Sequence, residues 1–450
     1  MRLLALAAAS LLGFSATALA QEAKPAEGAP PAEAPKPPPP PQFKFELHGF
    51  VSGSIYAQDA NLGVSEGQQA LFVNAQTAAA RAPNTDKLVL GGDVRQSRFN
   101  FSLAGPQVLS GATPKAVLEI DFFGGYGSGN YGDVSLLPRL RFAYGELNWG
   151  ANRIQVGQNN DLIFAMAPVS LAHIAFPYGY GSGNIGWRRP GVFGYHSVGP
   201  KSGTNVELAW EVGKANWADQ GNQPNATAGV GGPAIGGNGI GSNVVGAGGD
   251  KYGFGLGQAS GLPAVEARLT AASGTMASAF VTGHWHKVDR SGVDAQSSVA
   301  TGNAALDVVA GNAGFRVVGG PVTLAATGFV GKNLAPIIGD FLQFQPNTVR
   351  DVHEYGGWVQ AGFNFTKELS LWGYIGVDKP KFEDAVAAGY TRVQNVTSTG
   401  MLQYREAGYA LGFEWIHFHT TTRVPASGTT PNLSGALNGN QWIASANYFF

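Results

Sequence analysis

Charged side chains recur with a spacing of two in several short runs between residues 98 and 153. The basic members of this set are Arg98, Lys115, Arg139, Arg141 and Arg153, and the acidic members are Glu119 and Asp121. Alternate residues of a β-strand point to the same face of a sheet, so we expect all of them on one polar wall. The bases outnumber the acids, and a surplus of positive charge along a narrow passage would favour anions.

The same groups support a second interpretation, in which they pair with one another and brace the wall. Arginines and carboxylates on neighbouring strands lie close enough to form ion pairs. A braced wall would leave no arginine without a carboxylate partner, whereas a wall that attracts anions would keep some. The sequence places the side chains on one face in both cases, so it leaves the two interpretations open.

The segment 159–189 is the candidate for a constriction loop that narrows the passage. It contains Asp161, an apolar stretch at 162–166, a Gly- and Tyr-rich stretch at 176–186, and then Arg188. An apolar stretch in an exposed loop is unfavourable unless it packs on something, and the inside of a barrel would supply that surface. The alternative is an ordinary extracellular loop that is buried between subunits.

Strands with one apolar and one polar face must position these residues. In the first run, Phe45, Leu47, Val51 and Ile55 alternate with polar residues, and this period of two predicts half-buried strands. We expect sixteen, near 45–55, 98–103, 115–122, 138–149, 152–158, 190–198, 203–213, 252–272, 276–287, 303–318, 321–331, 352–365, 369–378, 396–405, 409–422 and 439–450. If glycines divide the run 252–272, a further strand must also have been missed and the number becomes eighteen, because such barrels have even strand numbers.

The links between these strands alternate between short and long. Short links fall at 148–151, 200–202, 273–275, 319–320, 366–368 and 406–408, and long ones at 59–91, 159–189, 214–251, 332–351 and 379–395. Short periplasmic turns opposite long extracellular loops are typical of outer-membrane barrels. A soluble sandwich or propeller gives no reason for the alternation.

Composition leads to the same fold class. Only 13% of the residues are charged, about half of what soluble domains carry, and the chain has 65 glycines and 26 phenylalanines. After the N-terminal segment, no stretch is apolar for long enough to form a transmembrane helix. Because only helices and closed barrels satisfy the backbone inside hydrocarbon, we predict an all-β fold, a transmembrane antiparallel up-and-down β-barrel at 44–450.

The two ends of the chain fit export to an outer membrane. Residues 1–20 combine one arginine, an apolar run and a final Ala-Leu-Ala, which predicts a cleaved signal peptide. Residues 21–43 are rich in proline and predict an extended periplasmic linker, either a plain spacer or a tether to peptidoglycan. Residues 441–450 place Trp442, Tyr448 and Phe450 on one face, as in a lipid-facing strand that closes the barrel. This ending also resembles the C-terminal targeting signal of outer-membrane proteins.

Several short motifs carry a resemblance to a known group. They are the segments 93–99 (DVRQSRF), 139–145 (RLRFAYG), 156–158 (VGQ), 389–405 and 447–450 (NYFF). Together they resemble trimeric porins of Gram-negative bacteria, in particular the DcaP-like group. The members compared carry a coiled coil where this chain has proline.

The resemblance implies an outer-membrane location, contact with lipid and lipopolysaccharide, and assembly as a homotrimer. It also implies passive diffusion of small hydrophilic solutes, and the basic wall adds a preference for anionic, carboxylate-type solutes. In such porins the third loop folds into the lumen, which is the position of 159–189.

Other kinds of chemistry lack a local motif. His284 and His286 flank Trp285, but their spacing supplies no further ligands, so we expect no metal site, and likewise no cofactor and no catalytic residue. The chain has no cysteine, and its net charge of −1 argues against a nucleic-acid partner. Two alternatives to a channel stay open: an outer-membrane barrel enzyme such as a lipid hydrolase, and a structural barrel that tethers the cell wall.

Overall fold

The structure is a computed structural model that describes residues 42–63, 67–74, 88–124, 136–200, 202–215, 260–289, 305–343, 351–423 and 434–450. The predicted signal peptide, nearly all of the predicted linker and the first part of the run 252–272 lie outside the described residues. No helix within these ranges is long and apolar enough to cross a membrane.

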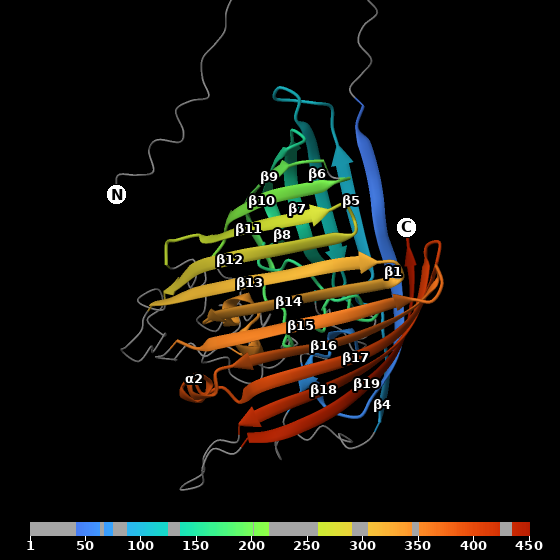
Figure 1. Ribbon diagram of the computed structural model, residues 1–450, viewed down its shortest axis with the longest axis vertical. Coiled ribbons are helices and arrows are strands. Elements are labelled where there is room, and N and C mark those ends of the chain that lie inside the picture. The colour runs from blue at the N-terminus through green and yellow to red at the C-terminus, as the bar shows by residue number, and fades with distance from the viewer. Residues whose placement is uncertain are drawn as a thin grey trace, which may run out of the picture. The chain divides into compact units, whose positions relative to one another are not determined.

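One antiparallel sheet closes on itself to form a barrel (Figure 1). Its strands are β1 (Lys44–Gln58), β4 (Val89–Asp93), β5 (Arg98–Ala104), β6 (Thr113–Asp121), β7 (Arg139–Asn148), β8 (Asn152–Asn160), β9 (Arg188–Val198), β10 (Thr204–Gly213), β11 (Ala264–Ser273), β12 (Ala277–Asp289), β13 (Ala305–Gly319), β14 (Val322–Lys332), β15 (His353–Asn364), β16 (Leu369–Pro380), β17 (Arg392–Glu406), β18 (Tyr409–Arg423) and β19 (Ser434–Phe449). Successive strands are neighbours, so the topology is up-and-down as predicted.

The number of strands in the barrel is sixteen, counted over the described residues. β4 and β5 pair with successive parts of β1, and they are therefore two halves of one broken strand. β11 occupies only the second part of the run 252–272 and pairs along its whole length with β10. The eighteen-stranded alternative is therefore not the fold of this chain.

The pairing of β1 with β19 closes the barrel. The register runs from Phe50 opposite Phe449 to Gln58 opposite Gln441. Beyond it, Gly49 and the terminal Phe450 exchange two backbone hydrogen bonds of 3.0 and 3.1 Å. The prediction that the last residues close the barrel is confirmed, although β19 begins earlier in the chain than expected.

The two faces of the strands separate apolar from polar side chains as the alternation predicts. On β1, Phe45 and Ile55 point outward and are 62% and 71% exposed, which suits contact with lipid. Ser52 and Ser54 point inward and are buried, and the Ser54 hydroxyl lies 2.8 Å from that of Ser445 on β19. The polar face therefore lines the interior.

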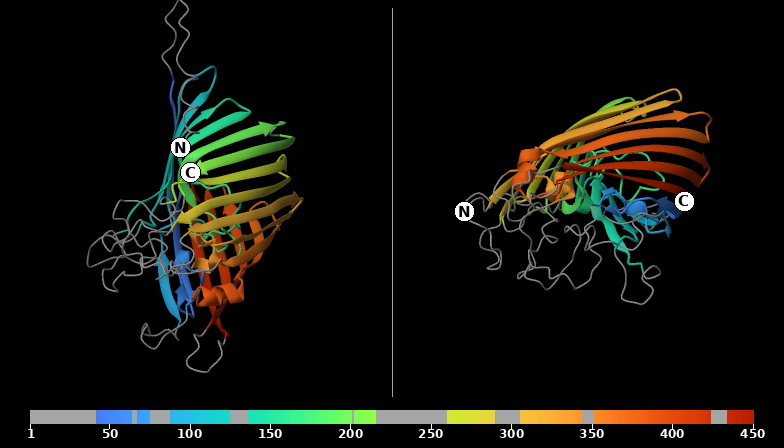
Figure 2. Two further views of the ribbon diagram at one scale, coloured as in Figure 1. Left: turned by 90° about the vertical axis from the view of Figure 1, so that its left-hand side faces the viewer. Right: turned by 90° about the horizontal axis from the view of Figure 1, so that it is seen from below.

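The connections alternate as expected, with short turns such as those between β7 and β8 or between β17 and β18 at one end of the barrel. At the other end, parts of three long connections pack among the inward-facing side chains. They belong to the links β1–β4, β8–β9 and β14–β15, and their regular elements are β2 (Leu62–Gly63), η1 (Gly67–Gln69), β3 (Phe72–Val73), η5 (Ala335–Ile337) and η6 (Asp340–Leu342). A short helix, α2 (Phe382–Ala387), follows β16. In Figure 2 the strands curve around the green trace of the β8–β9 connection.

Gly49 on β1 offers a test of how closely β1 packs against β5. A Cβ atom added to Gly49 would lie 2.1 Å from the carbonyl oxygen of Arg98, whereas nothing lies within 4 Å of one added to Gly53. We expect Gly49→Ala to destabilise the barrel by about 1–3 kcal/mol, because the backbone must shift, and Gly53→Ala to leave it unchanged. Urea unfolding of the refolded barrel in detergent measures both; equal stability of the two variants would contradict the close pairing of β1 with β5.

Candidate functional site

Two arginines and two carboxylates form the centre of the predicted polar wall. Arg139 on β7 binds Asp121 at the end of β6 through two hydrogen bonds, and the shorter is 2.5 Å. Arg141 binds Glu119 at 2.7 Å and also Asp121 at 3.1 Å. All four side chains face inward and are buried or nearly so. The bracing interpretation therefore holds for these residues.

Two further arginines on the same wall have no such partner. The Arg98 guanidinium is 3.6 Å from Glu119, and its Nε and Nη2 atoms make no hydrogen bond within the described structure. Arg188 stacks on Trp187, with its guanidinium carbon 4.0 Å from the ring centre, and forms no ion pair with any described carboxylate. We call Arg98, Arg139, Arg141 and Arg188 the arginine wall. Against Glu119 and Asp121 it keeps a surplus of positive charge.

Aromatic rings cover part of the arginine wall. The Arg139 guanidinium lies 4.7 Å from the ring centre of Phe176 and 5.3 Å from that of Phe123. Phe176 and Trp187 belong to the connection between β8 and β9, so this connection packs directly on the arginines. Cations are held over aromatic faces by the charge distribution of the ring, which fixes the guanidinium without neutralising it.

The remaining predicted residues lie elsewhere. Arg153 on β8 stacks on Tyr195 at 4.0 Å and is 3.9 Å from Glu146, a loose pair outside the wall. Lys115 on β6 pairs in register with Glu146 but forms no ion pair within the described structure. Asp161 does not face the arginine wall; it binds Arg189, a neighbour that sequence reasoning did not select. The structure thus brings together Arg98, Glu119, Asp121, Arg139, Arg141 and Arg188.

Asp161 joins the two ends of the predicted constriction loop 159–189; in the structure β8 and β9 leave residues 161–187 to this loop. The Asp161 carboxylate accepts hydrogen bonds from the backbone N–H of Trp187 at 2.8 Å and from Arg189 at 2.9 Å. Its own N–H donates to the carbonyl of Trp187. Burial raises the pKa of Asp161 to about 6, and the nearby carboxylate of Glu266 adds to this effect.

Carboxylates on the barrel wall hold the loop by its backbone. Glu211 on β10 accepts the N–H of Leu162, and Glu266 on β11 accepts that of Ile163 at 2.7 Å. Across the barrel, Glu414 on β18 accepts the N–H groups of Leu171 and Ala172 at 2.7 and 2.8 Å. A carboxylate that accepts several backbone N–H groups makes charge-assisted bonds, which are stronger than neutral ones.

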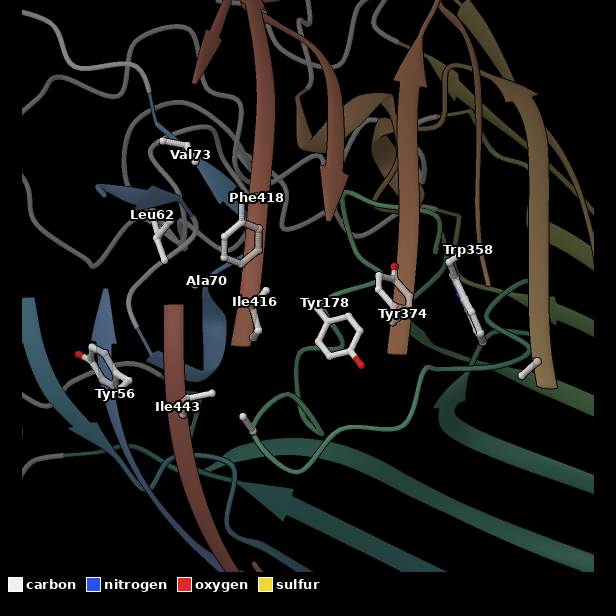
Figure 3. Packing of buried hydrophobic residues seen from close by; sticks show 12 residues of the cluster. Tyr56, Leu62, Ala70, Val73, Tyr178, Trp358, Tyr374, Ile416, Phe418 and Ile443 are labelled. Carbon is white, nitrogen blue, oxygen red and sulfur yellow. The ribbon is translucent and has the colours of Figure 1, made fainter. Parts of the chain in front are cut away.

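Apolar packing completes the attachment of the loop. Tyr178 is fully buried between wall residues, and its ring meets that of Tyr374 edge-on at 4.6 Å (Figure 3). The same cluster includes Trp358 from β15, Ile416 and Phe418 from β18, and Leu62 and Val73 from the β1–β4 connection. The loop is therefore packed inside the barrel among side chains from opposite walls.

Four residues of this arrangement were missed by sequence reasoning: Arg189, Glu211, Glu266 and Glu414. The signal for the three glutamates was their parity, since each occupies an inward position on a predicted strand. What could not be read was their partner, a loop backbone far along the chain. His284 and His286 do face inward, and Nδ1 of His284 lies 2.5 Å from the carboxylate of Glu266, to which its N–H donates. No group of three metal-ligating side chains with suitable geometry occurs among the described residues.

A barrel of this kind is also found in a solved structure. Fold and interior define a sixteen-stranded transmembrane β-barrel with loops packed inside. The crystal structure of the outer membrane channel DcaP of Acinetobacter baumannii is similar, with a TM-score of 0.62 and 16% identity over 91% of this chain and 97% of that one. The predicted resemblance to DcaP-like porins is confirmed at the level of the fold.

Other solved barrels are more distant. Salmonella typhi OmpF in complex with daunomycin gives a TM-score of 0.49 at 11% identity, covering 90% of this chain and 97% of that one. Outer-membrane expressed OmpT of Vibrio cholerae gives 0.47 at 9% identity, covering 91% and 98%. No protein-family model matches the chain, and no curated protein matches it in sequence.

The ion pairs of the arginine wall predict a large cost for removing one acid. Asp121 is fully buried and holds both Arg139 and Arg141, so Asp121→Asn leaves buried positive charge uncompensated. We expect a loss of about 3 kcal/mol in the free energy of unfolding. The control Asp351→Asn breaks a pair with Lys332 that is about one-third exposed, and should cost less than about 1 kcal/mol. Urea denaturation compares them, and similar losses would show that the wall is not held by these pairs.

Proposed function

We propose that this chain is an outer-membrane porin of a Gram-negative bacterium, through which small hydrophilic solutes diffuse passively with a preference for anions such as carboxylates. The arginine wall carries the proposal. Arg98 and Arg188 have no carboxylate partner within hydrogen-bonding distance in the described structure, while Glu119 and Asp121 are shared by Arg139 and Arg141. A positive surplus in a confined, partly desolvated space attracts anions more strongly than the same charges would in bulk water.

The loop 161–187 narrows the lumen, so that the surplus of positive charge on the arginine wall can act on passing solutes. In a sixteen-stranded barrel the lumen is wide enough for a water-filled channel, so selectivity depends on what narrows it. The loop fills part of the interior and places Phe176 and Trp187 against Arg139, which supports a passage bounded by the arginine wall. An anion passing there would exchange hydration water for guanidinium N–H groups, and weak, multiple contacts allow it to leave again.

A porin in the outer membrane would contact lipid, lipopolysaccharide and other copies of itself. Outward-facing side chains such as Leu90 and Val330 are 75% and 65% exposed, as befits contact with membrane lipid, and lipopolysaccharide would surround the extracellular rim. The DcaP-like fold supports assembly as a homotrimer. The proline-rich segment 21–43 adds a periplasmic spacer, or an attachment to peptidoglycan.

Ion selectivity tests the proposal directly. In planar bilayers under a KCl gradient, we expect the reversal potential of the wild type to indicate anion selectivity. Arg98→Ala and Arg188→Ala should each move it toward neutrality, because each removes one positive charge of the surplus: Arg188 forms no ion pair in the described structure, and Arg98 has only a long contact of 3.6 Å with Glu119. The control Lys367→Ala removes the same charge from an exposed turn and should leave the potential unchanged. Cation selectivity in the wild type, or an equal shift in all three variants, would refute the arginine wall as selectivity filter.

A further inference from the structure

A second loop inside the barrel has an unusually strained backbone. Residues 333–343 follow β14 and form the two short turns η5 and η6. Within this stretch, five residues other than glycine have a positive φ angle between 40° and 66°: Asn333, Ile338, Asp340, Phe341 and Leu342. Such a conformation is unfavourable for residues with a Cβ atom, and it persists only where the surroundings hold it in place.

One carboxyl group holds the strained part of this loop. Glu354 on β15 is directed at the turn η6 and accepts the backbone N–H groups of Asp340 and Phe341, the latter at 2.5 Å. The strained turn therefore depends on the acceptor capacity of a single buried side chain.

The loop 333–343 also supports the constriction loop. The carbonyl of Ile337 accepts the N–H of Gly186 at 2.6 Å, and Phe341 and Leu342 share an apolar cluster with Tyr180. A Cβ atom at Gly181 would lie 3.2 Å from both Phe341 and Leu342, so the two loops are in close contact. Displacement of the second loop would therefore remove support from the first.

Three carboxyl groups lie close to the turn, and none of them forms an ion pair within the described part of the chain. Asp340, Glu354 and Asp378 are all buried, and neither oxygen of Asp378 has an N–H or O–H partner within the described structure. Asp378 on β16 pairs in register with Gly356, so it is a diagonal neighbour of Glu354 on the same inward face of the sheet. Like charges at such a distance cannot all ionise at neutral pH without a large cost.

Charged groups on the surrounding elements are engaged elsewhere. Arg392 on β17 donates to the carbonyl of Leu342 at 2.8 Å and stacks on Phe72 and Phe341. Lys332 binds Asp351 at 2.7 Å, and His353 lies 2.8 Å from Asp384. Two tyrosines also lie near these carboxyl groups: the hydroxyl of Tyr390 donates to Asp340 at 3.4 Å, and that of Tyr374 donates to the carbonyl of Ser182 at 2.8 Å.

The direction of the pH dependence follows from Asp340. Burial, and then the Glu354 carboxylate, raise the pKa of Asp340 well above its ordinary value. The packed loop therefore binds protons more tightly than a released loop would. The stabilisation it gives is complete at low pH and is lost as the pH rises through the raised pKa of the packed state.

We propose that Asp340, Glu354 and Asp378 form a proton-dependent latch that keeps the loop 333–343 packed beneath the constriction loop and releases it when the latch loses its protons. Glu354 is the positioning residue, and Asp378 is the neighbouring carboxyl group whose charge adds to that of Glu354 and Asp340 when protons are lost. The effect on conduction rests on the proposed porin function, but the packing of the loop does not.

Thiol labelling tests the latch without reference to conduction. The natural chain has no cysteine, so Ala335→Cys reports on the buried loop and Lys367→Cys on an exposed turn of the same barrel. The ratio of the two labelling rates in detergent corrects for the reactivity of the thiolate itself. We expect this ratio to be low at acid pH and to rise steeply toward alkaline pH. A ratio that stays constant would overturn the proposal.

Two further substitutions separate a latch from simple structural support. Asp378→Asn keeps a neutral side chain beside Glu354 at every pH, so fewer charges oppose the packed loop and the rise should move to higher pH by about one unit or more. Glu354→Gln removes one acceptor and sets an N–H group against the turn, so labelling should be fast at every pH. The control Glu207→Gln changes an inward residue on β10 that bonds Ser197, and it should follow the wild type. An unshifted curve in Asp378→Asn would contradict the latch even if Glu354→Gln fails to fold.

Single-channel recording then links the latch to the passage. In the wild type, conductance should increase at alkaline pH, because the released loop 333–343 no longer supports the constriction loop. In Asp378→Asn, conductance should stay low over the same pH range. Labelling that depends on pH in a protein that does not conduct would retain the latch and refute the porin. Conduction together with labelling that does not depend on pH would retain the porin and refute the latch.

Discussion

The backbone pairing of β1 with β19 is the interaction on which the rest of the molecule depends. A sheet with two open edges would present unpaired N–H and C=O groups to hydrocarbon, where water cannot satisfy them. Joining Phe50–Gln58 to Gln441–Phe449 removes both edges at once. Closure also creates an inside, so that serine, glutamate and arginine side chains can share one polar compartment while phenylalanine and leucine face lipid. The arginine wall and the packed loops exist only because this seam is made.

Inside the closed barrel, carboxylates serve two distinct purposes. Glu119 and Asp121 neutralise arginines of the wall, while Glu211, Glu354 and Glu414 accept backbone N–H groups from loops that enter the lumen. A loop that leaves water must find partners for its amides, and side-chain oxygens on the inner wall supply them. The division leaves arginines in excess near β5–β9 and carboxyl groups gathered beneath the loops. The arginines and the carboxyl groups are thus separated on the inner wall of the barrel.

Sequence reasoning reached the fold because strand pairing is encoded locally. Alternation such as that around Phe45 and Ile55 assigns each residue to a face, and the lengths of the links decide which strands are neighbours. It reached the arginine wall for the same reason, since Arg139 lies opposite Asp121 on the next strand and Arg141 falls at the bulge beside Glu119. It did not reach the pairing of Asp161 with Arg189, nor the contact of Glu414 with Leu171, which are 243 residues apart. Those contacts depend on how a loop of irregular conformation packs, which no period in the sequence records.

One carbonyl group of the loop 161–187 has hydrogen bonds that can form only in the closed barrel. The oxygen of Leu171 accepts a hydrogen bond from Gln96, which lies between β4 and β5, and another from Asn447 on the last strand. The two donors stand on opposite sides of β1, so they come within reach of one acceptor only when the seam has formed. The loop therefore takes its final position at the end of assembly, together with the last strand. The barrel closes and the loop inside it reaches its final position in the same step. A chain that stops folding before its last strand pairs would have neither a closed barrel nor a positioned loop.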